Sequence, residues 1–152
     1  MSNISRDLTP GEIALLKTVF ASTIPYSEVK IRNYKAYFFQ PDDTAMTPDG
    51  KIYFPPKHYL ADFSVASLAI RAWLVHEGAH LYQFYSLGWS VKLRGMTDRN
   101  YDYVLDPRKK FQQYGLEQQG SIAQDYYILR NGGAISRPYN LSDFATTLPF
   151  PE

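Results

Sequence analysis

The residues of this chain that could do chemistry are concentrated in one short stretch, His76-Glu77-Gly78-Ala79-His80. If the stretch is helical, its two histidines are about one turn apart, so both imidazoles leave the same face of the helix. Two neutral imidazoles on one face can bind a divalent metal, and zinc fits such a pair best. Glu77 would then lie beside water activated by the metal and could take its proton. The pattern therefore predicts a zinc-dependent hydrolase of the metallopeptidase type.

The competing interpretation is a structural helix whose two histidines are satisfied by hydrogen bonds and whose Glu77 is exposed. The surrounding sequence argues against it, because the side chains from Val65 to Leu87 are nearly all apolar outside the motif. A helix that is apolar nearly all round is usually buried. Burying two imidazoles and a carboxylate is costly unless a partner compensates for them, and a metal ion would be that partner.

A catalytic zinc site usually has three protein ligands and one position open to water. The chain has no cysteine, so the third ligand must be another histidine, an aspartate or a glutamate. The only other histidine, His58, lies in a predicted loop after two prolines. Glu117 is the better candidate, because it lies on a predicted helix, Leu116–Arg130, that can return and pack against the first. Gly120, one turn after Glu117, would permit a close approach of the two helices.

Glu117 could instead be a solvated surface residue, like the glutamines around it, Gln118, Gln119 and Gln124. The need for a third ligand favours ligation. Two further roles have several candidates each, among which the sequence does not choose. Donors to a developing oxyanion could be Tyr114, Arg94 or His58. Acceptors for an imidazole N–H, which would orient the ring, could be Asp125, Asp102 or Asp106.

The elements that must position these residues follow from local patterns. A first helix is predicted from Pro10 to about Phe20, with Thr9 and Glu12 forming a capping box. Alternating, β-prone residues at 29–32 and 34–39 predict two short strands or one strand bent at Asn33. A further strand is predicted at residues 51–54. The strand at 51–54 ends at two prolines, which is typical of a sheet edge. Such an edge either pairs with an extended peptide or is merely closed off by the prolines.

The motif helix is predicted to begin at a cap provided by Asp62 or Ser64 and to end near Ser86, before Gly88. Residues 89–113 are predicted to be a loop with a short hairpin at 101–105, and a loop of this length can form a wall of the site. Residues 134–152 are predicted to lie over the surface as a tail without regular structure. With no linker in the sequence, residues 1–152 are expected to form a single domain.

Composition narrows the function further. The formal net charge is +1, so nothing in the overall charge favours nucleic-acid binding. Without cysteine, neither disulfides nor thiolate metal sites are possible. The N-terminus lacks the apolar core of a signal peptide, and no stretch reaches the roughly 18 apolar residues of a membrane span. We therefore expect synthesis in the cytoplasm and, if the protein is secreted, a route without a cleaved signal.

Four segments together resemble one family of bacterial toxins. The segments are Leu8-Thr9-Pro10-Gly11-Glu12, residues 40–50 (Gln-Pro-Asp-Asp-Thr-Ala-Met-Thr-Pro-Asp-Gly), the motif at 76–80, and Tyr114-Gly115-Leu116-Glu117-Gln118-Gln119. They are similar to the zinc metallopeptidase domains at the C-termini of some type VI secretion spike (VgrG) proteins and to their stand-alone relatives. The resemblance extends from about Leu8 to Arg130, and the metal motif and the Glu-Gln-Gln helix are its most specific parts.

The resemblance implies one zinc ion bound by His76, His80 and Glu117, with Glu77 as the general base, in a gluzincin-like fold. It also implies an antibacterial toxin that acts in the periplasm of a neighbouring cell, with a secretion spike and a cognate immunity protein as possible partners. The thermolysin-like arrangement has an aspartate four residues after the glutamate ligand, where this chain has Ser121. The groups that orient the metal ligands must therefore differ.

Taken together, the sequence predicts an α+β fold: a compact zincin-like metallopeptidase domain with two packed site helices and a small, mostly antiparallel sheet. The expected function is that of a zinc metallopeptidase acting as a secretion-system effector on a protein or peptide substrate. The alternative is a non-catalytic metal-binding or adaptor protein of a secretion system. The substrate itself, whether protein, peptide or cell-wall peptide, is not defined by the sequence.

Overall fold

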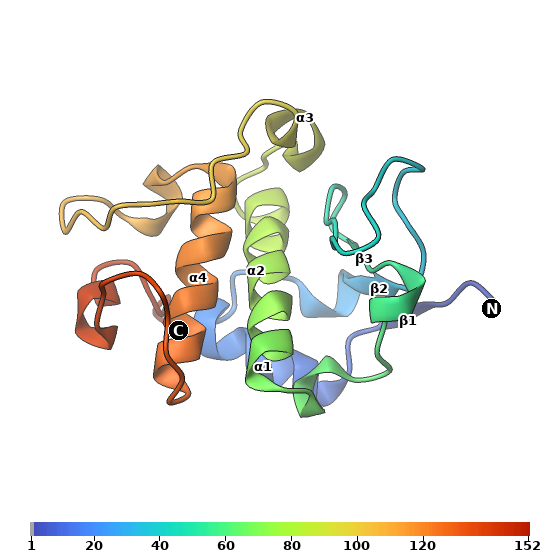
Figure 1. Cartoon of the computed structure of the whole chain (residues 1–152), viewed down its shortest axis with the longest axis horizontal. Coiled ribbons are helices and arrows are strands. Elements are labelled where there is room, and N and C mark those ends of the chain that lie inside the picture. The colour runs from blue at the N-terminus through green and yellow to red at the C-terminus, as the bar shows by residue number, and fades with distance from the viewer. Residues whose placement is uncertain (1) are drawn as a thin grey trace.

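The computed structural model describes residues 2–152, which form four α-helices and a three-stranded sheet (Figure 1). The predicted α+β class is therefore confirmed. The helices are α1 (Pro10–Phe20), α2 (Leu68–Tyr85), α3 (Val91–Gly95) and α4 (Leu116–Arg130), and the strands are β1 (Ser5–Asp7), β2 (Lys30–Arg32) and β3 (Ile52–Tyr53). Helix α2 lies at the centre, with α4 packed beside it and the sheet on its other side. Within the described residues, no helix is long and apolar enough to cross a membrane.

Helix α1 begins and ends where its sequence signals predict. The Thr9 hydroxyl accepts a hydrogen bond from the Glu12 N–H at 3.1 Å, and the Glu12 carboxylate accepts one from the Thr9 N–H at 2.8 Å. Glu12 is fully buried and also pairs with Arg6 and with the N–H of Phe63. One capping glutamate therefore joins β1, α1 and the turn that leads into α2.

Helix α2 begins later than the sequence predicts. Asp62 does act as a cap, but of a separate 3₁₀ helix, Phe63–Val65. Ala66 is extended after that turn, and the Ser67 hydroxyl then accepts a hydrogen bond from the N–H of Ile70 to start the α-helix. The prediction was wrong because two capping residues, Asp62 and Ser67, lie close together in the sequence. The extended backbone of Ala66 separates the two helices that they cap.

Close packing against α1 helps to hold α2 in place. On the α1 side, a Cβ added at Gly78 would lie 2.7 Å from the Phe20 ring and 2.8 Å from Leu16, so the glycine permits α1 to press against the middle of the metal-motif helix. Leu74, Val75, Ala79 and Leu81 of α2 are fully buried. A motif helix enclosed in this way cannot slide or rotate without opening the core.

The sheet is small and its pairing differs from the mostly antiparallel arrangement predicted. Strands β1 and β2 are antiparallel, but β2 and β3 are parallel, with Ile31 opposite Ile52 and Arg32 opposite Tyr53. A parallel pair needs a long connection rather than a tight hairpin. Residues 33–51 supply that connection, which the series of predicted turns did not reveal.

The predicted strand at 34–39 does not form, because side chains satisfy the backbone there. Buried Gln40 accepts a hydrogen bond from the N–H of Ala36 and donates to the carbonyls of Thr44 and Tyr53. The Asn33 side chain likewise accepts from the N–H of Ile4. These bonds fold the segment into a loop, although its alternating sequence is typical of a strand.

The strand at 51–54 is present, shortened to β3, but its outer edge is not free at Tyr53. Met46 forms an antiparallel bridge with Tyr53, with N···O distances of 3.0 and 2.8 Å in the two directions. The segment around Met46 therefore covers the edge predicted to receive a peptide. Its neighbour Thr47 is buried and, as described below, contacts the site.

Residues 89–113 contain a short helix rather than the predicted hairpin. Ser90 caps α3, and a 3₁₀ helix forms at Phe111–Gln113. Around the predicted hairpin, the N–H groups of Leu105 and Asp106 donate to the hydroxyls of Tyr139 and Tyr114. Tyrosine side chains therefore take the place of a partner strand.

The predicted surface tail, 134–152, is partly a core segment. It forms a 3₁₀ helix at Leu141–Phe144, and both Phe144 and Leu148 are buried in the main apolar cluster. The Phe150 N–H donates to the carbonyl of Val19, and the Phe150 ring stacks on Tyr82 with centroids 4.8 Å apart. The tail therefore fastens α1 to α2. The Pro, Ser and Thr content of the tail suggested a surface segment, although Phe144, Leu148 and Phe150 attach it to the core.

We predict that Phe144→Ala destabilises the protein by about 3–5 kcal/mol, because it removes a fully buried aromatic ring. Chemical denaturation monitored by circular dichroism would measure the change. Leu141→Ala in the same turn is the control. Leu141 is 43% exposed, so the loss should stay within about 0.5 kcal/mol. Equal effects of the two changes would show that the tail is not part of the core.

Candidate metal centre

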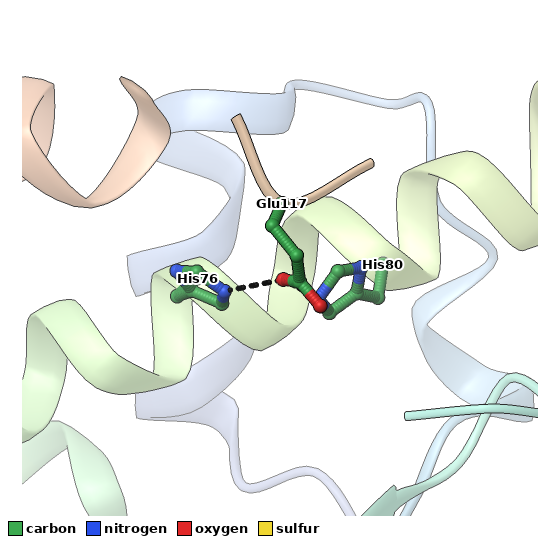
Figure 2. Close-up of side chains that lie close together, drawn as sticks. All are labelled: His76, His80 and Glu117. Atoms are coloured by element: carbon green, nitrogen blue, oxygen red, sulfur yellow. Dashed lines mark hydrogen bonds and ion pairs between the residues drawn. The ribbon is translucent and has the colours of Figure 1, made fainter. Parts of the chain in front are cut away.

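The three predicted ligands lie together between α2 and α4. One oxygen of Glu117 is 3.1 Å from Nε2 of His76 and 3.0 Å from Nε2 of His80. Figure 2 shows the carboxylate reaching across from the start of α4 to the two rings on α2. The three donor atoms lie within 4.8 Å of one another, and both histidines are buried. This group could hold a metal ion.

The chemistry of the donors fits zinc. Two imidazole nitrogens and one carboxylate oxygen are a known catalytic ligand set for zinc. In a tetrahedral site with bonds of about 2.0–2.1 Å, neighbouring ligand atoms are about 3.3 Å apart. The contacts of Glu117 with the two Nε2 atoms, at 3.1 and 3.0 Å, are close to that separation. Small side-chain movements would therefore suffice to admit the ion.

Glutamines, not the predicted aspartates, orient the two rings. Nδ1 of His76 lies 3.2 Å from Oε1 of Gln124, and Nδ1 of His80 lies 2.8 Å from Oε1 of Gln83. Since an amide oxygen only accepts, each ring carries a proton on Nδ1, and its Nε2 faces Glu117. Gln124 lies three residues beyond Ser121, so it supplies the orientation that an aspartate four residues after the ligand would otherwise give.

Gln83 also fixes α4 relative to α2. Its amide nitrogen donates to the carbonyl of Leu116 at 2.8 Å and to Oε1 of Gln119 at 3.0 Å. Gln119 in turn donates to the carbonyl of Tyr114. Both glutamines are fully buried. The chain of hydrogen bonds runs from the His80 ring to the first turn of α4, which carries Glu117.

Gly120 permits the close approach that its position in the sequence predicts. A Cβ built at Gly120 would lie 2.5–2.8 Å from three atoms of the His76 ring. Such distances are not tolerated between non-bonded atoms, so only glycine lets α4 pass this close to the imidazole. The helix-weakening residue is therefore a requirement of the site's geometry.

Burial and mutual contact set the charges of the cluster. Burial acts to raise the pKa of Glu117, but its hydrogen bonds with His76 and His80 outweigh burial and hold the pKa well below its usual range. Burial acts to lower the pKa of His80, but the hydrogen bond and charge of Glu117 outweigh it and raise the pKa to about 9. Without a metal, a proton therefore supplies the positive charge that this buried carboxylate requires.

Glu77 is buried beside the same cluster. Its Oε1 accepts a hydrogen bond from the Thr47 hydroxyl at 2.8 Å, and burial raises the pKa of its carboxyl, against the opposing charges of His80 and His76. A carboxylate with a raised pKa is better matched to taking up a proton near neutral pH. Thr47 orients Glu77 from the segment that covers β3, a contact with no signature in the sequence.

Tyr101 forms part of the wall of the cluster, although its sequence pattern suggested only a hairpin. Its ring lies against the His76 ring, with centroids 5.8 Å apart and planes 24° from parallel. Its hydroxyl also lies near the carboxylate of Glu117. The predicted role of residues 89–113 as a wall of the site is confirmed through this residue.

The other residues proposed for the site have partners elsewhere. The Tyr114 hydroxyl bonds to the backbone of Asp106, the Arg94 guanidinium stacks on Trp89 at 3.9 Å, and His58 packs edge-on against Trp73. The suggested imidazole acceptors also bond to other groups, Asp125 to Tyr103 and Arg137, Asp102 to Arg137, and Asp106 to Arg108. Those acceptor predictions were wrong, because each aspartate has a nearby cation or hydroxyl to neutralise it.

The fold and the site define a class, a small α+β domain with a buried His₂-Glu cluster beside a second glutamate. No protein-family model matches the chain. The chain is 36% identical over 135 residues to the type VI secretion system spike protein VgrG2b of Pseudomonas aeruginosa, a match that covers 83% of this chain and 13% of that protein. It therefore spans only a small part of the length of this curated relative.

A solved structure gives the same assignment. The effector domain of Pseudomonas aeruginosa VgrG2b superposes with a TM-score of 0.79 at 33% identity, over 94% of this chain and 84% of the solved domain. The chain therefore belongs to the family of the VgrG2b effector domain, an effector associated with a type VI secretion spike.

We predict that Gly120→Ala lowers zinc affinity at least about tenfold, because the new Cβ displaces the His76 ring from Glu117. Helix propensity alone would instead make alanine more stable by about 1 kcal/mol. A chelator competition assay would measure the affinity. The control is Gly95→Ala, where the nearest atom, Leu116 Cδ2, is 3.7 Å away and zinc binding should not change. Unchanged affinity in Gly120→Ala would contradict the close approach.

Zinc binding should release a proton from His80, because a pKa near 9 keeps that ring protonated at neutral pH and a ligand must be neutral. We expect about one proton released per zinc at about pH 7 and less above about pH 9, with apparent affinity rising over that range. Calorimetry in buffers of different ionisation enthalpy would count the protons. A pH-independent affinity would contradict this charge assignment.

Proposed function

We propose that this chain is a zinc-dependent peptidase with a zincin-like fold, acting as an antibacterial effector of a type VI secretion system. The observation that carries the proposal is the convergence of His76, His80 and Glu117, with Glu77 buried beside them. Two ligands come from one helix and the third from a helix packed against it. Two buried carboxylates beside two imidazoles favour a metal site over a purely structural network. Without a cation, their negative charge requires a bound proton.

The chain's own residues suit amide hydrolysis. When bound, zinc would lower the pKa of water towards neutrality and polarise the carbonyl under attack. Glu77, held by Thr47, accepts the proton of the attacking water and passes it to the leaving nitrogen. Gln83 and Gln124 keep the two Nε2 atoms directed at the centre. The two rings are buried and the Glu117 side chain is only 14% exposed, so the packed helices keep most bulk water from the cluster.

The biological role rests on kinship. The related domain is named as an effector domain of a secretion spike protein. We propose that this chain likewise acts after delivery, in the periplasm of a target cell, with a secretion spike as its carrier and a cognate immunity protein as its inhibitor. Peptide bonds of periplasmic proteins or of cell-wall stem peptides are its proposed substrates.

The direct test compares wild type, Glu77→Gln and His76→Ala. Wild type purified without added zinc should hold about one zinc per chain and cleave denatured casein or peptidoglycan stem peptides. Glu77→Gln should keep the zinc and lose at least about 10³-fold in activity, because only the proton acceptor is removed. His76→Ala should lose the zinc. Mass spectrometry of the metal and of the cleavage products would give both readings.

The same variants separate the proposal from its rivals. Full activity in Glu77→Gln would refute the mechanism. Zinc at full occupancy without cleavage of any tested substrate would favour a non-catalytic metal-binding protein. Less than about 0.2 zinc per chain, with no micromolar affinity, would favour an adaptor without metal.

A second prediction concerns the compartment. Exported to the periplasm of a Gram-negative host, wild type should stop growth, whereas the same protein kept in the cytoplasm should not. Glu77→Gln, exported at the same level, is the matched control and should be harmless. Growth arrest by the exported Glu77→Gln protein would show that toxicity does not depend on hydrolysis.

A further inference from the structure

Tyr101 stands apart from the other tyrosines near the centre because it is both half-exposed and in contact with the cluster. It is 48% exposed, whereas His76 and His80 are buried. It comes from the irregular segment between α3 and α4, and its ring covers one face of His76. A side chain placed this way can contact both the buried ligands and a molecule arriving from solvent.

The hydroxyl of Tyr101 lies near the carboxylate of Glu117 and within range of the charge of Glu77. A phenolic hydroxyl keeps its proton at neutral pH, so it is a hydrogen-bond donor.

We infer that Tyr101 is a catalytic residue of the proposed hydrolysis, whose hydroxyl donates a hydrogen bond to the oxyanion formed from the scissile carbonyl. This inference rests on the proposed function. A donor is required there because the negative charge that develops on the carbonyl oxygen needs stabilisation beyond that of a metal. The three donors suggested by the sequence contact other groups: the Tyr114 hydroxyl lies at the Asp106 backbone, the Arg94 guanidinium on Trp89 and the His58 ring on Trp73. Tyr101, by contrast, contacts His76 of the cluster.

The step balances without any further reactant. The water oxygen bonds to the carbonyl carbon, the π pair of the C=O bond moves onto the oxygen, and Glu77 takes a proton from the water. Tyr101 donates a hydrogen bond to the resulting oxyanion and keeps its proton. The C=O bond then re-forms, the C–N bond breaks, and the nitrogen receives the proton from Glu77. The products are a carboxylic acid and an amine.

The test is Tyr101→Phe, which keeps the ring against His76 and removes only the hydroxyl. We expect kcat to fall about 10²–10³-fold, while KM and zinc affinity each stay within about threefold of wild type. A role in holding Glu117 would instead lower zinc affinity. Tyr114→Phe is the matched control, since its hydroxyl bonds to the Asp106 backbone, and it should retain kcat within about threefold.

Binding of inhibitors gives a reading that does not depend on turnover. A phosphinic peptide carries a tetrahedral anionic group in place of the cleaved amide, and Tyr101→Phe should bind it at least about 30-fold more weakly than wild type. The uncleaved peptide, measured in the Glu77→Gln background, should bind equally well with Tyr101 or Phe at that position. Calorimetry or fluorescence anisotropy would measure both affinities.

The outcomes separate this inference from the function on which it rests. If wild type cleaves and Glu77→Gln does not, but Tyr101→Phe keeps full kcat and full affinity for the phosphinic peptide, the inference about Tyr101 is overturned and the peptidase proposal stands. A loss of activity in Tyr101→Phe that is restored by excess zinc would also overturn it, since the hydroxyl would then act on metal binding alone. If wild type itself neither binds zinc nor cleaves, both proposals fail.

Discussion

The contact on which the rest of this structure depends is the Glu117 carboxylate shared between the Nε2 atoms of His76 and His80. The carboxylate and the two rings are largely removed from water, so each would be costly to bury alone. Their separation of about 3 Å exists only because α4 lies unusually close to α2, which Gly120 permits. The close packing of α4 on α2 therefore also brings the three ligands together, so neither can change without the other.

The neutral character of the supporting groups matters for the charge of this buried cluster. The rings are held by the amides of Gln83 and Gln124, where aspartates would have added negative charge. When both imidazoles are neutral, as metal ligands must be, the charged groups of the cluster are the carboxylates of Glu77 and Glu117. A divalent cation would balance both. This choice of glutamine also ties His80 to the start of α4, since an amide donates as well as accepts.

Much of the site could be predicted from the sequence because its signals are local. The spacing of His76 and His80, the requirement for a third ligand, and the ends of α1 and α4 all follow from short patterns. Groups brought in from elsewhere could not be predicted in this way. Thr47, Gln83, Gln124 and Tyr101 belong to residue types common on any surface, and only the packed chain brings them to the cluster. The predictions of a strand at 34–39 and of a surface tail at 134–152 were wrong for a related reason. Side chains from other segments satisfy the backbone of the first, and the core buries residues of the second.

Kinship with the VgrG2b effector domain supports the proposed effector role, and the geometry of the cluster supports the proposed metal site. The most direct measurement is anomalous diffraction at the zinc edge from crystals of the protein purified without added zinc. The account predicts one peak, about 2.0–2.2 Å from Nε2 of His76, Nε2 of His80 and a carboxylate oxygen of Glu117. An absence of zinc from this position, with Glu117 still bonded directly to both rings in zinc-supplemented crystals, would contradict it.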